Sequence, residues 1–296
     1  MDFNEIQKQL RDIAKELLIS GDFEMLIGYG EGSLPQKVTP IFIRKPEEAE
    51  HLVFNEYCSP NLVTYLKKFK PKDKKIAIVT KACDNRSLVM LIKEKQIERE
   101  KIFIIGVECP GITISPEINK ESNLDVICIS CTIRSPVIYD RLLKIGERGE
   151  IEKKEEFKLS DEEIEAFEKM SPNERWKYFQ NEIKKCIRCY ACRNVCPLCY
   201  CEQCFVDITS PRWLSEGLDA SDLTFYHLVR ILHSAGRCGK CGACEHACPM
   251  GIRLRFLTRK MSDIIEELYG TKAGINPDEP PALGVFREAD DNSLFK

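Results

Sequence analysis

Two short runs of cysteine in the second half of this chain share one spacing, and that spacing is typical of iron–sulfur chemistry. Both runs follow the pattern Cys-x2-Cys-x2-Cys-x3-Cys-Pro, and their cysteines are Cys186, Cys189, Cys192 and Cys196, then Cys238, Cys241, Cys244 and Cys248. A 4Fe-4S cubane needs four thiolates, and two copies of this pattern bind two cubanes. The spacing therefore predicts a pair of clusters that exchange single electrons.

The last cysteine of each run is predicted to serve the cluster of the other run. Three cysteines at two-residue gaps can wrap three corners of a cubane, but so short a loop cannot supply the fourth ligand. Pro197 and Pro249 would turn the chain away, and Gly239 and Gly242 would let backbone N–H groups approach the sulfurs. A zinc site is the alternative, although zinc favours separated Cys-x2-Cys pairs. The expected ligand sets are Cys186, Cys189, Cys192 and Cys248 for cluster 1, and Cys238, Cys241, Cys244 and Cys196 for cluster 2.

Half of the sixteen cysteines lie outside these two runs. Cys83 and Cys109 each follow a predicted strand, at the end where ligands gather in parallel sheets. Cys128 and Cys131 form a Cys-x2-Cys pair after another predicted strand. We expect these four to hold a third cluster, and the alternative for each is a small buried hydrophobic side chain.

Three more cysteines crowd the segment after Pro197. Cys199, Cys201 and Cys204 fall within six residues, which is hard to explain by packing. They predict three ligands of a fourth cluster. Cys58 is the one cysteine not assigned to another set, and it would complete this one. The third and fourth clusters would then tie the two halves of the chain together, so that folding depends on cluster assembly.

Composition narrows the class of protein. The chain has 296 residues and a formal net charge of −3, which gives no basic field for nucleic acid. It contains no apolar run of membrane-spanning length, and its first residues read as an amphipathic helix rather than a signal peptide. So many cysteines without a secretory signal favour metal ligands in a reducing, cytoplasmic setting.

The first half predicts an α/β domain over 1–148 with a mainly parallel sheet, because short apolar runs alternate with helical patterns. A helix is expected over 3–18 from its apolar periodicity. Further strands are expected at 25–29, 40–43, 75–80, 101–107 and 125–129, and further helices at 60–69, 85–96 and 136–145.

The second half predicts a helical domain around the two cysteine runs. A charged linker is expected at 149–159, a two-cluster α-helical ferredoxin domain at 160–270 and an extended tail at 271–296. Capping boxes at Ser160 and Ser171 should each begin a helix. Helical patterns also cover 221–234 and about 252–269, and Gly270 should end the last helix. The fold class is therefore α+β, with the helical part resembling the ferredoxin modules of succinate dehydrogenase and heterodisulfide reductase subunits.

A glycine-rich turn offers a candidate phosphate site. Gly28, Gly30 and Gly32 follow or interrupt the strand expected at 25–29 and could cradle the phosphate of a flavin. The dinucleotide-binding spacing is missing, and no clear helix follows. An ordinary glycine-rich turn is the alternative.

Parts of the first half resemble the beta subunits of deazaflavin-reducing hydrogenases and formate dehydrogenases. The segments that carry the resemblance are Lys81-Ala82-Cys83-Asp84 and Ile105-Gly106-Val107-Glu108-Cys109. The family has a Gly-Thr-Pro-Cys-like segment, then a strand ending in cysteine, then a Cys-x2-Cys pair. That pair maps onto Cys128 with Cys131, or onto Cys201 with Cys204. The resemblance implies a 4Fe-4S cluster, a bound FAD and oxidation or reduction of a deazaflavin or similar hydride carrier.

Two redox roles and one structural role follow as hypotheses. The first is an iron–sulfur subunit of a hydrogenase-, formate-dehydrogenase- or heterodisulfide-reductase-like complex, which relays single electrons between the flavin or iron–sulfur centres of its partner subunits. The second is an oxidoreductase subunit whose FAD couples hydride transfer, from a deazaflavin or NAD(P), to the clusters. The third is a metal-stabilised assembly protein. The sequence predicts no catalytic residue, electron donor or acceptor.

Overall fold

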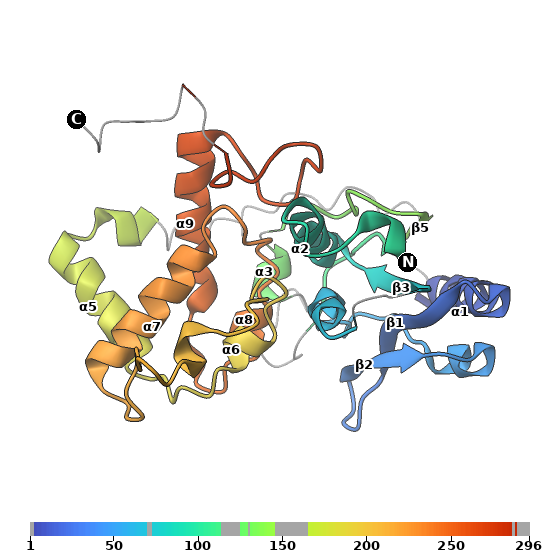
Figure 1. Cartoon of the computed structure of the whole chain (residues 1–296), viewed down its shortest axis with the longest axis horizontal. Helices are drawn as coiled ribbons and strands as arrows, with labels where there is room; N and C mark the ends of the chain where they lie inside the picture. Colours follow the sequence, from blue (N-terminus) through green and yellow to red (C-terminus); the bar gives the residue numbers. More distant parts are fainter. Residues whose placement is uncertain are drawn as a thin grey trace. The chain divides into compact units, whose positions relative to one another are not determined.

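The computed structural model describes residues 3–69, 73–113, 125–129, 131–145, 165–285 and 288. The chain divides into two compact units, described here one at a time. Met1–Phe157 and Gly274–Glu279 form the first, the α/β unit, and Lys158–Ala273 and Pro280–Lys296 form the second, the helical unit. Figure 1 shows the elements of each. The predicted linker at 149–159 and the predicted start of a helix at Ser160 lie outside the described residues.

The α/β unit is built on a five-stranded sheet in the order β2-β1-β3-β4-β5. Its strands are β1 (Phe23–Glu31), β2 (Val38–Ile43), β3 (Lys75–Thr80), β4 (Ile102–Val107) and β5 (Arg141–Leu143). Only the edge pair β1 and β2 is antiparallel, and β1, β3, β4 and β5 run parallel. The predicted mainly parallel sheet is therefore confirmed.

Apolar side chains explain why the central strands are buried on both faces. Ile78 of β3 lies opposite Ile104 of β4, and both are fully buried. Helix α1 (Phe3–Ser20) buries a stripe of apolar residues spaced three or four apart and packs on β1. Helix α2 (Ala82–Lys93) packs on β3 and β4. A continuous apolar run is the pattern expected of a strand covered on both sides.

Two predictions of secondary structure were wrong. The run at 125–129 was expected as a strand and contains the short helix α3 (Val126–Ile129). The segment at 136–145 was expected as a helix and contains β5, which pairs with the end of β4. Asp140 fixes this strand, because its carboxylate accepts a hydrogen bond of 2.7 Å from the backbone of Ile104. Periodicity alone does not separate strand from helix in such short runs.

Short 3-10 helices complete the connections of the α/β unit. The predicted helix at 60–69 is the 3-10 helix η2 (Leu62–Lys67), which Asn61 caps by accepting a bond from the backbone of Val63. Two further 3-10 helices, η1 (Pro46–His51) and η3 (Arg99–Lys101), flank the sheet.

The helical unit consists of helices and loops, which confirms the predicted helical second half. Its elements are α5 (Pro172–Ile183), α6 (Ala191–Asn194), η5 (Phe205–Asp207), α7 (Ala220–His233), α8 (Ala243–His246) and α9 (Leu254–Tyr269). In Figure 1 these run from yellow-green α5 to red α9. Phe179, Ile183 and Ile231 form a buried cluster against Leu257 and Met261, and so pack α5, α7 and α9 together.

Two predicted helix ends of this unit, at Ser171 and Gly270, are present. Ser171 caps α5, because its hydroxyl accepts a bond from the backbone of Glu174 while the Glu174 carboxylate accepts one of 2.7 Å from Ser171. Gly270 ends α9 in the left-handed region with a φ of 66°. Within the described ranges, no helix has the length and apolar character needed to span a membrane.

A short segment from near the end of the chain completes the α/β unit. Residues 274–279 lie against α2, and Lys93 Nζ donates a 3.1 Å hydrogen bond to the carbonyl oxygen of Asn276. Gly274 has a φ of 70°, and a Cβ at this position would lie 2.3 Å from the backbone oxygen of Arg86. Only glycine fits here, because both the backbone angle and the space exclude a side chain.

Replacing Gly274 with alanine should loosen this segment. We expect the α/β unit to lose about 2–4 kcal/mol, from the left-handed strain and the clash together. Hydrogen exchange in peptides of α2 measures the effect. Gly21→Ala is the matched control, because Gly21 has a φ of 79° with no atom within 4 Å of the added Cβ. Equal exchange in the two variants would show that the close approach to Arg86 does not matter.

Candidate metal centres

The two cysteine runs fold into loops of the same conformation. The first loop, 186–192, has left-handed residues at Arg188 (φ 52°) and Tyr190 (φ 56°). The second loop, 238–244, has them at the matching positions, Lys240 (φ 58°) and Gly242 (φ 72°). Each loop leads into a one-turn helix, α6 or α8, and these two helices pack on each other. The repeated spacing therefore corresponds to a repeated backbone path, along which three cysteines follow one another.

Backbone N–H groups point at sulfur in both loops. The N–H of Arg188 donates to Cys186 Sγ over 3.3 Å, and the N–H of Lys240 donates to Cys238. The N–H of Ile252 lies 3.5 Å from Cys248 Sγ. Hydrogen bonds to cluster sulfurs raise the reduction potential of a cluster, so the loops supply this effect through their backbone.

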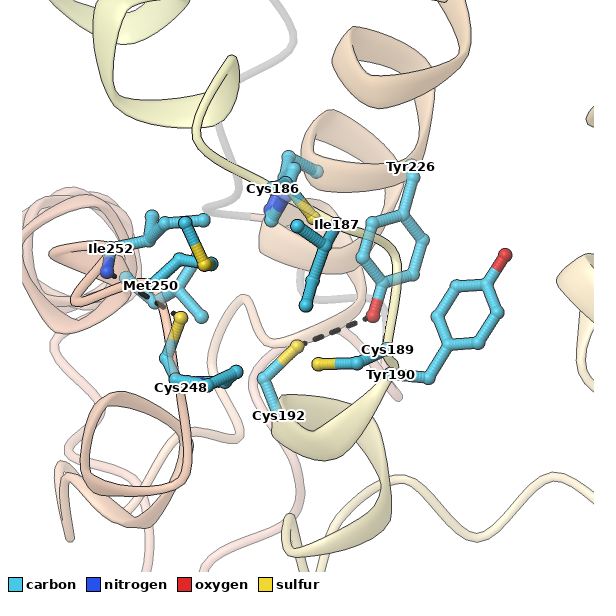
Figure 2. A pocket seen from close by; sticks show the side chains of 12 residues that line it. Cys186, Ile187, Cys189, Tyr190, Cys192, Tyr226, Cys248, Met250 and Ile252 are labelled. Atoms are coloured by element: carbon cyan, nitrogen blue, oxygen red, sulfur yellow. Dashed lines mark hydrogen bonds between the residues drawn. The ribbon is translucent and has the colours of Figure 1, made fainter. Parts of the chain in front are cut away.

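Cys186, Cys189, Cys192 and Cys248 line one cavity of about 320 Å³, part of which is open solvent. Figure 2 shows these four cysteines around a shared space. Cys248 comes from the second run, so the structure brings the predicted crossing cysteine to the first loop. The four thiols are those expected for cluster 1, and their role as ligands stays a prediction.

The walls of this cavity suit a cubane. Ile187, Met250 and Ile252 make it apolar, while the hydroxyl of Tyr226 lies 3.3 Å from Cys192 Sγ. His227 is 1 % exposed, and neither ring nitrogen has a hydrogen-bond partner among the described residues. Burial lowers the pKa of His227 to about 4, which keeps the ring neutral with one N–H to donate. A sulfide-rich group would accept the bonds that Tyr226 and His227 offer.

The second loop gathers the thiols expected for cluster 2. Cys244 interacts electrostatically with Cys238, Cys196 and Cys241, so the crossing cysteine again lies with the three loop cysteines. Burial raises the pKa of both Cys238 and Cys244. Such thiols stay protonated until a metal displaces the proton, so loading this site releases protons. This ligand set also stays a prediction.

The described thiols are spread too widely for a single metal ion. No group of three or more His, Cys, Asp or Glu side chains among the described residues converges as a one-ion site would. In a cubane each thiolate binds a different iron, so its ligands stand apart.

The four thiols expected for cluster 3 lie in the α/β unit. Cys83 is in the first turn of α2 and Cys109 follows β4, so both stand at the carboxyl edge of the sheet. Cys128, in α3, interacts with Cys109 and Cys131, and its Sγ accepts a 3.3 Å bond from the backbone of Ile112. The predicted position at the sheet edge is therefore found, while ligation by these four stays a prediction.

The set expected for cluster 4 is divided between the two units. Cys58 belongs to the α/β unit, where burial raises its pKa to about 12 and its charged neighbours are Lys81, Asp84 and Cys109. Cys199, Cys201 and Cys204 belong to the helical unit, and Cys201 is exposed. The structure thus places Cys58 beside the third set, and the fourth set stays a prediction.

Sequence reasoning missed a buried charged network beside these thiols. Lys81 Nζ bonds Asp84 Oδ2 at 2.7 Å and the carbonyl oxygen of Pro60 at 3.1 Å, and it also contacts the hydroxyl of Tyr29. The side chains of Lys81 and Asp84 are only 2 % and 1 % exposed. Burial lowers the pKa of Lys81, but the charge of Asp84 outweighs it and the pKa is raised. The only sequence signal was an acid three residues after a lysine at the start of a helix.

The predicted flavin-phosphate glycines have packing roles. A Cβ on Gly28 would lie 2.3 Å from Leu52, and one on Gly30 would lie 2.6 Å from Ile41. Both glycines are inside β1, and Gly32 bonds Lys37 at the turn into β2. Close packing and a hairpin turn account for all three, and their role at a flavin phosphate stays a prediction.

The left-handed position of Gly242 provides a test of the second loop. Gly242→Val should cost at least about 1–2 kcal/mol in the loop, because a β-branched residue is strained at a φ of 72°. Cluster 2 should then load poorly under anaerobic reconstitution, measured by iron and sulfide content. Gly242→Asn is the control, since asparagine tolerates this conformation. Equal loading of both variants would remove the loop conformation as a requirement.

The comparisons with known proteins agree with this site. Residues 182–252 match a family model described as a 4Fe-4S dicluster domain. This range contains both loops and both crossing cysteines, so the helical unit carries a 4Fe-4S dicluster domain. The predicted 4Fe-4S clusters of this region are thereby confirmed.

Whole-chain similarity extends the comparison to the α/β unit. The F420-dependent formate dehydrogenase subunit beta of Methanocaldococcus jannaschii is 27% identical over 84% of this chain and 86% of that protein. The F420-dependent formate dehydrogenase 1 subunit beta of Methanococcus maripaludis is 24% identical over 91% of each. The predicted resemblance to formate dehydrogenase beta subunits is confirmed.

One solved structure aligns with part of this chain. A chain of the F420-reducing NiFe hydrogenase complex from Methanosarcina barkeri aligns over 40% of this chain and 48% of its own length. The identity is 18% and the TM-score is 0.31. This chain thus spans about half of that one, and the likeness is too slight to define the fold.

Proposed function

We propose that this chain is the iron–sulfur electron-transfer subunit of a multi-subunit anaerobic oxidoreductase, of the formate dehydrogenase or hydrogenase type. The observation that carries the proposal is the pair of matching loops, each with a cysteine of the other run beside it, within a region that matches a 4Fe-4S dicluster domain. Two such sites in one small unit suit the passage of single electrons from one partner centre to another.

The residues around the loops would hold the clusters and set their potentials. When bound, each cubane supplies a one-electron redox couple. Cys186, Cys189, Cys192 and Cys248 would hold the first, and Cys238, Cys241, Cys244 and Cys196 the second. The neutral donors Tyr226 and His227 would stabilise negative charge at the first site, while its apolar walls exclude water. The protein itself need form no bond to a substrate.

Further parts of the proposal follow the predicted boundaries. We place the α/β domain at 1–148, the linker at 149–159, the dicluster domain at 160–270 and the tail at 271–296. Cys83, Cys109, Cys128 and Cys131 would hold a third cluster, and Cys58, Cys199, Cys201 and Cys204 a fourth. The partners would be flavin or iron–sulfur subunits of one cytoplasmic complex.

A second candidate function rests on the extent of the sequence similarity. The two formate dehydrogenase relatives match over 84% and 91% of this chain, beyond the dicluster region, and both are named as F420-dependent. In this case FAD would bind the chain, exchange hydride with F420 or a similar carrier and pass single electrons to the clusters. Gly28, Gly30 and Gly32 are the glycines that the sequence offers for its phosphate, and Gly28 and Gly30 also pack closely against Leu52 and Ile41.

Analysis of the anaerobically purified chain tests both candidates. The relay predicts about 8 iron atoms with matching sulfide for two cubanes, or about 16 for four, and no released flavin. One equivalent of FAD after denaturation would favour the second candidate. The reduced chain should also return its electrons to a one-electron acceptor in proportion to its iron. A folded chain that lacks sulfide would refute both.

A further inference from the structure

Arg230 contacts the surroundings of both proposed cluster sites. It lies on the buried face of α7, one turn after Tyr226 and His227. Its Nη2 donates a 2.8 Å hydrogen bond to the carbonyl oxygen of Cys192, in the first loop. Its charge interacts most strongly with Cys244, Cys192, Cys196 and Cys199. Cys192 belongs to the first ligand set, while Cys244 and Cys196 belong to the second.

Among the described residues, no carboxylate forms an ion pair with this arginine. Arg230 is 8 % exposed, and its Nε has no hydrogen-bond partner among the described residues. No ion pair to a carboxylate is found for it in the described part of the chain. An unpaired buried cation is costly, so its environment must supply negative charge. The thiols around it supply that charge once they are deprotonated.

Three other cations in or beside the two loops have carboxylate partners. Arg188 lies 3.7 Å from Asp222, Arg193 lies 2.8 Å from Asp207, and Lys240 lies 2.7 Å from Asp263. Each of these carboxylates offsets part of the positive charge of its partner. Arg230 differs from these three cations, because no carboxylate pairs with it among the described residues.

We propose that Arg230 is a cation shared by the two cubane sites, and that it raises the reduction potential of both clusters. The proposal rests on the proposed function and its two ligand sets. Four thiolates make each cubane site negative, and reduction adds another negative charge to it. In a buried site a nearby cation stabilises that added charge strongly. Because Arg230 faces both sets, it also lessens the repulsion between two reduced clusters.

Arg230→Gln tests the proposal in the full-length, cluster-loaded chain. EPR-monitored redox titration should show both midpoint potentials lowered, each by at least a tenfold change in the reduction equilibrium, about 59 mV for one electron. Arg230→Lys keeps the charge and should restore most of each shift. The exposed pair Arg212 and Glu216 gives the control, because Arg212→Gln removes a cation that lies at the surface.

The premise and the proposal fail in different ways. If the wild-type chain lacks two cubanes by iron and sulfide content, the ligand sets are wrong and the proposed function falls first. If Arg230→Gln holds both clusters at unchanged potentials, Arg230 is only a structural donor to Cys192. If Arg230→Gln does not load, Arg230→Lys is titrated in its place, and whatever shift it leaves should appear in both potentials. A shift of the first potential alone would overturn the shared role.

Discussion

Replacing Cys248 with alanine should remove the cluster of the first loop and leave the cluster of the second. Cys248 follows the second loop in sequence, but it lines the cavity formed with Cys186, Cys189 and Cys192. A substitution in one motif should thus damage the site built on the other. The expected loss is about four iron atoms and four sulfides per chain.

The mirror variant makes this result specific. Cys196→Ala should remove the second cluster, because Cys196 lies with Cys238, Cys241 and Cys244. The two variants should therefore lose different EPR signals, and each should retain the signal that the other loses. Variants of the loop cysteines assign the EPR signals to the two clusters, because Cys189→Ala should lose the same signal as Cys248→Ala. If Cys248→Ala instead matches Cys241→Ala, each run holds its own cluster and the crossing assignment is wrong.

Replacing Asp84 with asparagine should destabilise the α/β unit by about 3–5 kcal/mol, because it leaves the ammonium of Lys81 buried without its counter-charge. Asparagine keeps the size of the side chain and can still accept from the backbone of Lys81, so the substitution isolates the charge. Urea unfolding under anaerobic conditions, followed by hydrogen exchange in peptides of β1 and α2, measures the loss.

A surface pair provides the matched control for this substitution. Lys15 and Glu50 form an equally short bond of 2.6 Å, but their side chains are 39% and 58% exposed. Glu50→Gln should therefore cost less than about 1 kcal/mol. The double variant Lys81→Met/Asp84→Leu should recover more than half of the stability, since removing both charges also removes their desolvation cost. If Asp84→Asn is as stable as wild type, Lys81 must have another counter-charge.

The cluster region could be predicted from the sequence because the residues that specify its structure lie close together in the chain. Ligand spacing, the proline after each run and the capping signals all lie within a few residues of the structure that they specify. The same reasoning placed Cys83 and Cys109 at the carboxyl edge of the sheet, because both follow strongly apolar strands. Gly270 and Ser171 marked helix ends for the same reason.

Other features depend on contacts between distant residues, which one sequence does not reveal. Three residues of β5 are a strand only because β4 offers an edge to pair with. Lys81 was not recognised as buried, because its partners Tyr29 and Pro60 come from other parts of the chain. Arg230 looked like an ordinary residue of an amphipathic helix. Its closeness to both ligand sets appears only when α7 packs beside the loops.

The segment at 274–279 has a consequence for how this protein is made. During translation the strands of the sheet are synthesised first. Residues 274–279, which pack against α2, leave the ribosome only after every cysteine of the dicluster region. The nascent amino-terminal half therefore waits, incomplete, while the iron-binding half is synthesised. A gene truncated after residue 157 would encode a sheet without residues 274–279, whereas a stop codon placed after residue 279 would keep them.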